Sequence, residues 1–227
     1  MKADIRDRFI ARVVKGKSFA DVGGLWGVVN EKVSVAHTAG AASVSMVDIT
    51  PKGAELWQHF EERMKDSGIS EYGCLPGNIC EFRDTVFDVV HCSGVLYHHP
   101  SPMMILDALH RVTREHLVLT SAITQETIKN ELGTYRVAPS GTIFIPALDA
   151  RERAILGRYW EDAGAEIDGI HHAAEFSVDE FGPWWWLPTG YSLLAMCRAA
   201  GFDVLDEGHA WNDNAYTLLL RPKESRS

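Results

Sequence analysis

The residues best suited to chemistry stand together in Tyr97-His98-His99, in the loop that follows a predicted strand over residues 87–92. Histidine gains and loses a proton near neutral pH, so it can remove the proton of a reacting hydroxyl or protonated amine. A neighbouring tyrosine can orient a ligand or stack on it. We predict that one of the two histidines is a catalytic base and that the other fixes its loop, and the sequence leaves open which.

A glycine turn is the second candidate site, in Asp21-Val22-Gly23-Gly24-Leu25-Trp26-Gly27. Glycines between a strand and a helix let backbone amides approach a ligand at the helix N-terminus. Dinucleotide-binding enzymes have G-x-G-x-x-G at this place, whereas this chain has G-G-x-x-G, with Asp21 two residues before the first glycine. If the motif stood alone, a plain tight turn would explain it equally well.

Two further features follow later strands of the predicted sheet. Asp48 ends the second strand, where a carboxylate can accept hydrogen bonds from ribose hydroxyls, although a turn aspartate before Pro51 is the simpler interpretation. The triplet Gly77-Asn78-Ile79 follows the third strand. Because the carboxyl ends of parallel strands meet at one edge of a sheet, these features converge with the glycine turn on a single crevice.

The elements that must position these residues alternate along the chain. Strand and helix patterns in turn predict a Rossmann-like α/β fold, with a mostly parallel seven-stranded sheet covered by helices on both faces. We expect helices over residues 4–14, 25–37, 52–66, 101–112 and 189–200, and strands over 18–22, 42–48, 72–75, 87–92, 116–121, 202–207 and 216–220.

The alternation stops over residues 124–183, which we interpret as an insertion after the fifth strand within one domain spanning 1–227. We expect helical pieces over 125–132 and 149–160 and no separate apolar core. Loops at this end of a parallel sheet bind substrates, so the insertion is expected to form a lid over the acceptor. The candidate acceptor-binding residues are Tyr135, His171, His172 and, from the following tryptophan tract, Trp185.

The glycine turn resembles motif I of class I S-adenosylmethionine (SAM)-dependent methyltransferases, with Leu25 where that family has its middle glycine. The resemblance implies SAM as cofactor, bound by Asp21, Gly23, Gly24 and Gly27. It implies that Asp48 and the adjacent Ile49 contact the ribose side, and that Asn78 and Ile79 contact the adenine. Asn78 replaces the usual aspartate of the family, and its side-chain oxygen can still accept from the adenine amino group.

The segment Gly94-Val-Leu-Tyr-His98 resembles the loop after the fourth strand in the branch that includes the bacterial tRNA wobble-uridine carboxymethyltransferases. Trp186-Leu-Pro-Thr189 and Ala200-Gly201-Phe202 extend this resemblance, which covers most of the chain outside residues 124–183. It implies that the backbone of Cys92 and Ser93 holds the SAM amino group. It also places Tyr97 near the transferable group and one of the paired histidines toward the acceptor.

Composition restricts the partners. The chain has 227 residues and a net charge of −9, so it repels a phosphate backbone unless its basic residues cluster, and nucleic acid is disfavoured. No apolar run reaches the length of a membrane span, and no signal peptide is recognised, so we predict a soluble, cytoplasmic monomer or homodimer. Histidine pairs at 98–99 and 171–172 lack metal-binding spacing, so no metal site is predicted, although a metal-dependent enzyme remains a minor hypothesis.

The leading hypothesis is a methyltransferase that transfers the SAM methyl group in line to an oxygen or nitrogen of a small molecule, in natural-product biosynthesis. A tRNA-modifying transferase that uses SAM or carboxylated SAM is the first alternative, and it requires a positively charged groove. A SAM-binding module without catalysis is the second, because Leu25 and Asn78 depart from the family pattern. A nicotinamide-dependent oxidoreductase fits less well, since the glycine spacing differs.

Overall fold

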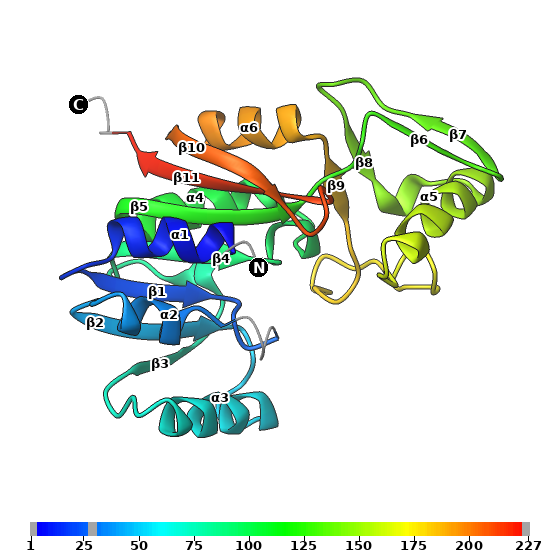
Figure 1. The fold of residues 1–227 in the computed structure, drawn as a ribbon. Helices are drawn as coiled ribbons and strands as arrows, with labels where there is room; N and C mark the ends of the chain where they lie inside the picture. The colour runs from blue at the N-terminus through cyan, green and yellow to red at the C-terminus, as the bar shows by residue number, and fades with distance from the viewer. Residues whose placement is uncertain (1–3, 27–30, 224–227) are drawn as a thin grey trace.

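The computed structural model describes residues 4–26 and 31–223, and its core is a seven-stranded sheet with helices on both faces (Figure 1). The strands lie in the order β3-β2-β1-β4-β5-β11-β10, and only β11 runs antiparallel to its neighbours. The predicted Rossmann-like, mostly parallel sheet is therefore confirmed. Its strands are β1 (Ser18–Val22), β2 (Ser43–Asp48), β3 (Gly73–Pro76), β4 (Phe87–Ser93), β5 (Thr113–Ala122), β10 (Phe202–Ala210) and β11 (Ala215–Pro222).

The strand order reverses at β1, which pairs in parallel with β2 on one side and with β4 on the other. The connections that leave these strands diverge, so a crevice opens at their carboxyl ends, where open α/β sheets bind ligands. Asp21, Asp48 and Ser93 lie at or next to the ends of their strands, on three adjacent members of the sheet. The topology thus brings together the residues that the sequence analysis placed in one crevice.

Each face of the sheet has its own apolar core. One layer packs against α1 (Ile5–Val13), α2 (Val33–Thr38) and α3 (Glu55–Asp66), and the other against α4 (Pro102–Val112) and α6 (Gly190–Ala199). Within β4, Val89 belongs to the first layer and Val90 to the second. Both faces of the strand are buried, which explains why its apolar residues do not simply alternate with polar ones.

One predicted helix is shorter than expected. We predicted a helix over residues 25–37, but α2 begins at Val33, and Leu25 and Trp26 form part of a turn. Residues 27–30 lie outside the described part of the chain. The backbone N–H of Leu25 instead donates to the carboxylate of Asp48, and the N–H of Lys32, just before α2, donates to Asp21.

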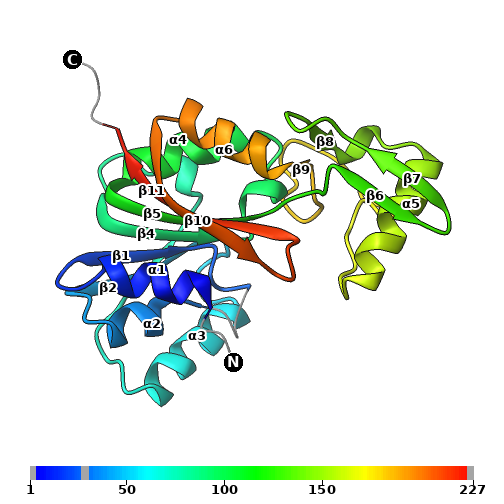
Figure 2. The ribbon, with the colours of Figure 1, turned by 45° about the horizontal axis from the view of Figure 1, so that its top comes forward.

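The insertion leaves the sheet after β5 and lies beyond the strand ends in both views (Figures 1 and 2). The helix predicted over 149–160 is confirmed as α5 (Ala150–Asp162), and Asp149 and Glu152 form a capping box at its start. The helix predicted over 125–132 is wrong, because this segment is a β-hairpin of β6 (Thr127–Asn130) and β7 (Gly133–Arg136). A second small sheet pairs β8 (Thr142–Phe144) with β9 (Trp186–Pro188).

The expectation that the insertion has no apolar core is also wrong. Ile128, Ile145, Leu156 and Trp160 are buried together in a third cluster, which reaches the main domain through Tyr97. Among the described residues, no helix is long and apolar enough to span a bilayer. That residues 1–227 form one domain, and that it is cytoplasmic, stay predictions.

Candidate active site

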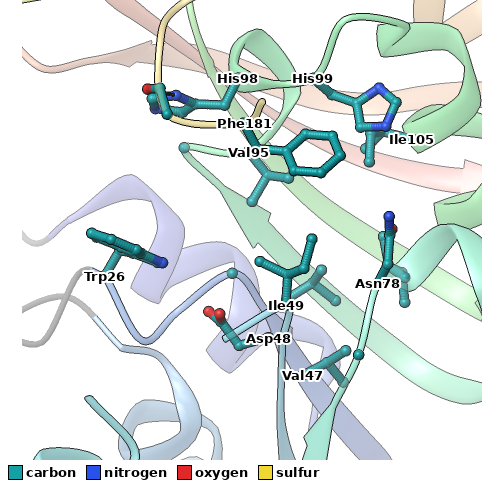
Figure 3. Close-up of a pocket in the computed structure, with 16 residues that line it drawn as sticks. Trp26, Val47, Asp48, Ile49, Asn78, Val95, His98, His99, Ile105 and Phe181 are labelled. Atoms are coloured by element: carbon teal, nitrogen blue, oxygen red, sulfur yellow. Dashed lines mark hydrogen bonds between the residues drawn. The ribbon is translucent and has the colours of Figure 1, made fainter. Parts of the chain in front are cut away.

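A cleft opens at the carboxyl ends of β1, β2, β3 and β4, and residues of the insertion close one side of it (Figure 3). Its empty space, including the part open to solvent, measures about 890 Å³. The wall is mostly apolar with a few polar groups on separate strands, which is typical of a small-molecule site. The predicted site residues that line it are Gly23, Asp48, Ile49, Asn78, Ile79, His98 and His99.

The glycine turn after β1 is required by contacts on both of its sides. Gly23 has a φ of +78°, and a β-carbon there would collide with Val95 of the loop after β4. A β-carbon on Gly24 would collide with the carboxylate of Asp21. Gly23 therefore lines the cleft, while Gly24 lets the turn lie directly over Asp21. Gly27, the third predicted glycine, lies outside the described residues.

Asp21 does not line the cleft, because it is fully buried beneath this turn. One of its carboxylate oxygens accepts the backbone N–H of Lys32 at 2.7 Å, and the other lies 2.7 Å from Nδ1 of His91, which donates to it. His91 stands opposite Asp21 in the pairing of β1 with β4. The acid therefore fixes the turn from below, and sequence reasoning missed His91 because only strand pairing brings the two side chains together.

Leu25 stands where the family motif has a glycine, but its side chain does not line the cleft. Its side chain is 2% exposed and packs in the core layer of α1, α2 and α3. Its backbone N–H donates to Oδ2 of Asp48 at 3.3 Å, which links the turn to the end of β2. The adjacent Trp26 does line the cleft and is 76% exposed, although the sequence analysis did not single it out.

Asp48 lies at the base of the cleft and is only 2% exposed. Its Oδ1 accepts the backbone N–H of Thr50 at 2.9 Å and the Thr50 hydroxyl at 2.7 Å. The Leu25 N–H occupies one lone pair of Oδ2. Three of about four lone pairs of the carboxylate are therefore used, and the free one is on Oδ2. Ile49 is 48% exposed beside it, so a flat apolar ligand face can cover an otherwise solvated side chain (Figure 3).

Asn78 begins a short 3-10 turn over Ile79–Glu81, and its Oδ1 accepts the backbone N–H of Cys80 at 3.0 Å. From the sequence, this oxygen was predicted to accept a hydrogen bond from the ligand. In the structure the oxygen caps the turn, and the amide nitrogen points into the cleft (Figure 3). Ile79 is buried and contributes an apolar wall.

The two adjacent histidines differ in which ring nitrogen is engaged. Nδ1 of His98 lies 2.8 Å from the carbonyl oxygen of Gly182, so this nitrogen carries the proton and donates it. Nε2 of His98 therefore holds the free lone pair of the neutral ring. Burial lowers the pKa of His98 below the ordinary 6.5, and the hydrogen bond to Gly182 opposes that shift in part. The ring is accordingly neutral at pH 7 and able to accept a proton.

His99 has the opposite arrangement. Its Nδ1 accepts the backbone N–H of Ser101 at 2.9 Å, so the proton of the neutral ring is on Nε2, which is a donor. The ring stacks on Phe181 with the ring centroids 5.2 Å apart. Burial also lowers the pKa of His99. The geometry thus separates the two histidines that the sequence could not tell apart.

Phe181 and Gly182 come from the end of the insertion and form the roof of the cleft, which we call the strap. His98 bonds to the strap through Gly182 and His99 stacks against it through Phe181. Sequence reasoning missed both strap residues, because Phe-Gly-Pro before the tryptophan tract matches no motif. The same holds for Val95 and Ile105, which complete the apolar wall.

Three other predicted residues lie behind the cleft wall. Tyr97 is buried against Trp184, with the ring centroids 4.2 Å apart, and burial raises its pKa. The thiol of Cys92 is fully buried in the core layer of α4 and α6. The Ser93 hydroxyl accepts from Arg6 at 3.4 Å. Tyr97 therefore supports the loop and the strap, since its backbone carbonyl also accepts the N–H of Trp185 at 2.7 Å.

The four predicted acceptor-binding residues do not line the cleft. Both ring nitrogens of His171 are used within the insertion, by Ile167 N–H and by the carbonyl of Gly157. Trp185 is buried, and its indole N–H donates to the Glu180 carbonyl. Tyr135 lies half-buried on β7, and His172 is exposed beside Glu166. Local sequence gave no means to separate these supporting roles from ligand contact.

Charge near the cleft is sparse and negative. Among the described residues that line it, Asp48 is the only Asp or Glu, and none is Lys or Arg. The insertion over residues 124–183 carries eleven acidic against five basic residues, a net charge of −6. Within the described ranges, no group of three or more metal-ligand side chains gathers. An anionic ligand would therefore find no cationic side chain in this cleft.

Part of the chain matches a known protein family. Residues 20–119 match the model of a family described as a methyltransferase domain, and this segment holds most of β1 and β5, all of β2, β3 and β4, and most of the cleft wall. The segment that forms most of the cleft is thus similar to a methyltransferase domain. No protein of curated function matches the chain in sequence.

Solved methyltransferases share the fold at low identity. The magnesium protoporphyrin IX methyltransferase of Synechocystis, solved with S-adenosylhomocysteine (SAH) bound, is 14% identical with a TM-score of 0.58, covering 96% of this chain and 82% of that one. The 1,6-didemethyltoxoflavin N1-methyltransferase of Burkholderia thailandensis is 12% identical (TM-score 0.56, 98% and 80%). Mitomycin 7-O-methyltransferase is 13% identical (TM-score 0.57, 96% and 53%), so the chain spans about half of that enzyme.

Proposed function

We propose that this protein is a class I methyltransferase that transfers the methyl group of SAM to an oxygen or nitrogen of a small molecule, with His98 as the base. The observation that carries the proposal is the state of the His98 ring in the cleft. Its Nδ1–H donates to Gly182 at 2.8 Å, which leaves Nε2 as a proton acceptor in a ring that burial keeps neutral. His99 does not offer this, because Ser101 occupies its Nδ1.

The cleft fits the cofactor residue by residue. Gly23 has no side chain where the cofactor must pass the loop after β4, and Gly94 and Val95 of that loop line the cleft opposite it. The free lone pair of Asp48 suits a ribose hydroxyl, while Ile49 and Ile79 offer apolar faces to a purine. SAM supplies an electrophilic methyl group on its sulfonium, and the protein has to align an acceptor with it.

Two tasks then fall to residues of the cleft. His98 takes the proton of a hydroxyl or ammonium acceptor through Nε2, which a general base does with a gain of about 10²- to 10⁴-fold. The strap excludes water above the reacting groups and is held by both histidines. Asp21 contributes indirectly, since its bonds to Lys32 and His91 fix the glycine turn.

A small acceptor without negative charge is the best fit. The described cleft lining holds no Lys or Arg, and the insertion has a net charge of −6. A tRNA substrate or the extra carboxylate of carboxylated SAM would require a cationic partner there. The names of the three structural neighbours also indicate small-molecule substrates, which supports this class for the present chain.

The test has two stages. Calorimetric titration with SAM, SAH and NADH is expected to give binding of the two adenosyl ligands alone, and Asp48→Ala should abolish it. Transfer of a labelled methyl group from SAM is then followed into a library of phenols, alcohols and amines and, in parallel, into bulk tRNA. Label in the small molecules supports the proposal. Label in tRNA alone, or binding without any transfer, contradicts it.

A further inference from the structure

Asn78 presents a hydrogen-bond donor to the cleft, and the reason lies in its contact with Cys80. A backbone N–H can only donate, so the atom that faces the N–H of Cys80 at 3.0 Å must be the side-chain oxygen. The amide nitrogen is the other branch of the same planar group and points into the cleft (Figure 3). Rotating the amide by half a turn would place two donors against each other at the cap.

An aspartate at this position would behave differently. One of its oxygens would cap the Cys80 N–H in the same way, and the other would present an acceptor to the cleft. An acceptor there suits the amino group at position 6 of adenine. The asparagine of this chain instead offers two N–H groups, which suit an oxygen at position 6 or a ring nitrogen.

We propose that the side-chain amide of Asn78 donates a hydrogen bond to the edge of the cofactor purine. The site then accepts a purine with oxygen at position 6, which the carboxylate of an aspartate at position 78 would repel. The inference rests on the cofactor placement proposed above. A second side chain agrees with it. His99 lies on the same side of the cleft, and its Nε2–H is also a donor because Ser101 occupies Nδ1 (Figure 3).

No other described side chain in this wall offers a hydrogen bond that would distinguish an amino group from an oxygen at position 6 of the purine. Ile49, Ile79 and Ile105 line it with apolar surface. The preference at position 6 therefore depends on Asn78 with a contribution from His99. Because the site already favours acceptors on the ligand, exchanging the purine amino group for oxygen should cost little binding.

The experiment compares two ligands on two proteins by calorimetry. The ligands are SAH and S-inosyl-L-homocysteine, which has oxygen in place of the purine amino group and carries a proton on the adjacent N1. The wild-type protein is expected to bind the two with similar affinity, within about threefold. Asn78→Asp is expected to raise the ratio of SAH affinity to S-inosyl-L-homocysteine affinity by about tenfold to a hundredfold, since one charged hydrogen bond is gained and one repulsion is created.

Asn78→Ser provides the matched control, because serine keeps an oxygen for the Cys80 N–H and removes the amide nitrogen that faces the cleft without adding charge. It should weaken both ligands without a large change in their ratio. A wild-type protein that rejects the 6-oxo ligand as strongly as Asn78→Asp does, or an unchanged ratio in that variant, would overturn the inference while leaving the cofactor site intact. Failure of wild type to bind either ligand would overturn the proposed function as well.

Discussion

Replacing His98 by asparagine removes the proposed base and keeps the hydrogen bond to the strap. The amide nitrogen of asparagine occupies nearly the place of Nδ1, so the bond to the Gly182 carbonyl at 2.8 Å can be kept. Only Nε2 is lost. We expect kcat to fall by about 10²- to 10⁴-fold, or about 2.7 to 5.4 kcal/mol of transition-state stabilisation, with SAH affinity unchanged.

His99→Asn is the matched control for the neighbouring ring. Its side-chain oxygen can still accept the Ser101 N–H, while the stacking on Phe181 is lost. Such an aromatic contact contributes about 0.5–1.5 kcal/mol, so we expect at most about a tenfold loss in kcat/KM. The assay is a single-turnover measurement with labelled SAM and the acceptor identified by the transfer screen.

The pH profile gives an independent readout of the same assignment. Burial lowers the pKa of His98, so the basic form persists as pH falls from neutral, and kcat should decrease only below the ordinary value of 6.5. Protonation removes the acceptor, which is why activity is lost on the acid side. In His98→Asn this acid limb should vanish. Nearly full activity in His98→Asn, or an equal loss in His99→Asn, would refute the assignment.

Three further variants test the cofactor site and the insertion. Asp48→Asn removes the charge at the ribose position and should weaken SAH by about tenfold or more in calorimetry; equal affinity would exclude Asp48 as a ligand. Leu156→Ala should lower the free energy of unfolding in urea by about 2–5 kcal/mol, whereas the half-exposed Leu132→Ala should change it little; equal effects would contradict the insertion core. Asp149→Ala should cost about 1 kcal/mol through loss of the capping box, and an unchanged urea midpoint would argue against that cap.

The sheet was predictable because its signals are local and repeated. Buried parallel strands are rich in apolar residues, as at Leu117-Val118-Leu119, and the strands alternate with helical patterns along the chain. The hairpin of β6 and β7 was missed because its apolar residues at Ile128 and Leu132 have helical spacing. Tertiary packing of Ile128 into the insertion core and the turn at Gly133, with φ of +144°, decide for strands.

The roles within the site were less predictable than its location. Strand ends placed Asp48 and Asn78 correctly in one cleft, because topology alone brings those positions together. The distinction between His98 and His99 depends on Gly182, which is 84 residues away from His98. Asp21 was expected at the ligand and is instead covered by the turn it supports. Such hydrogen-bond partners leave no trace in local residue patterns.

The insertion leaves and rejoins the main domain at almost the same point. The backbone N–H of Thr124 donates to the carbonyl of Pro188 at 2.8 Å, so the two ends of the segment are one hydrogen bond apart. The segment packs on a buried cluster that it shares with Tyr97 and Ala122. Ends this close together place no demand on the length of the segment between them. We therefore expect that the seven-stranded sheet still folds when a short glycine linker joins the two ends.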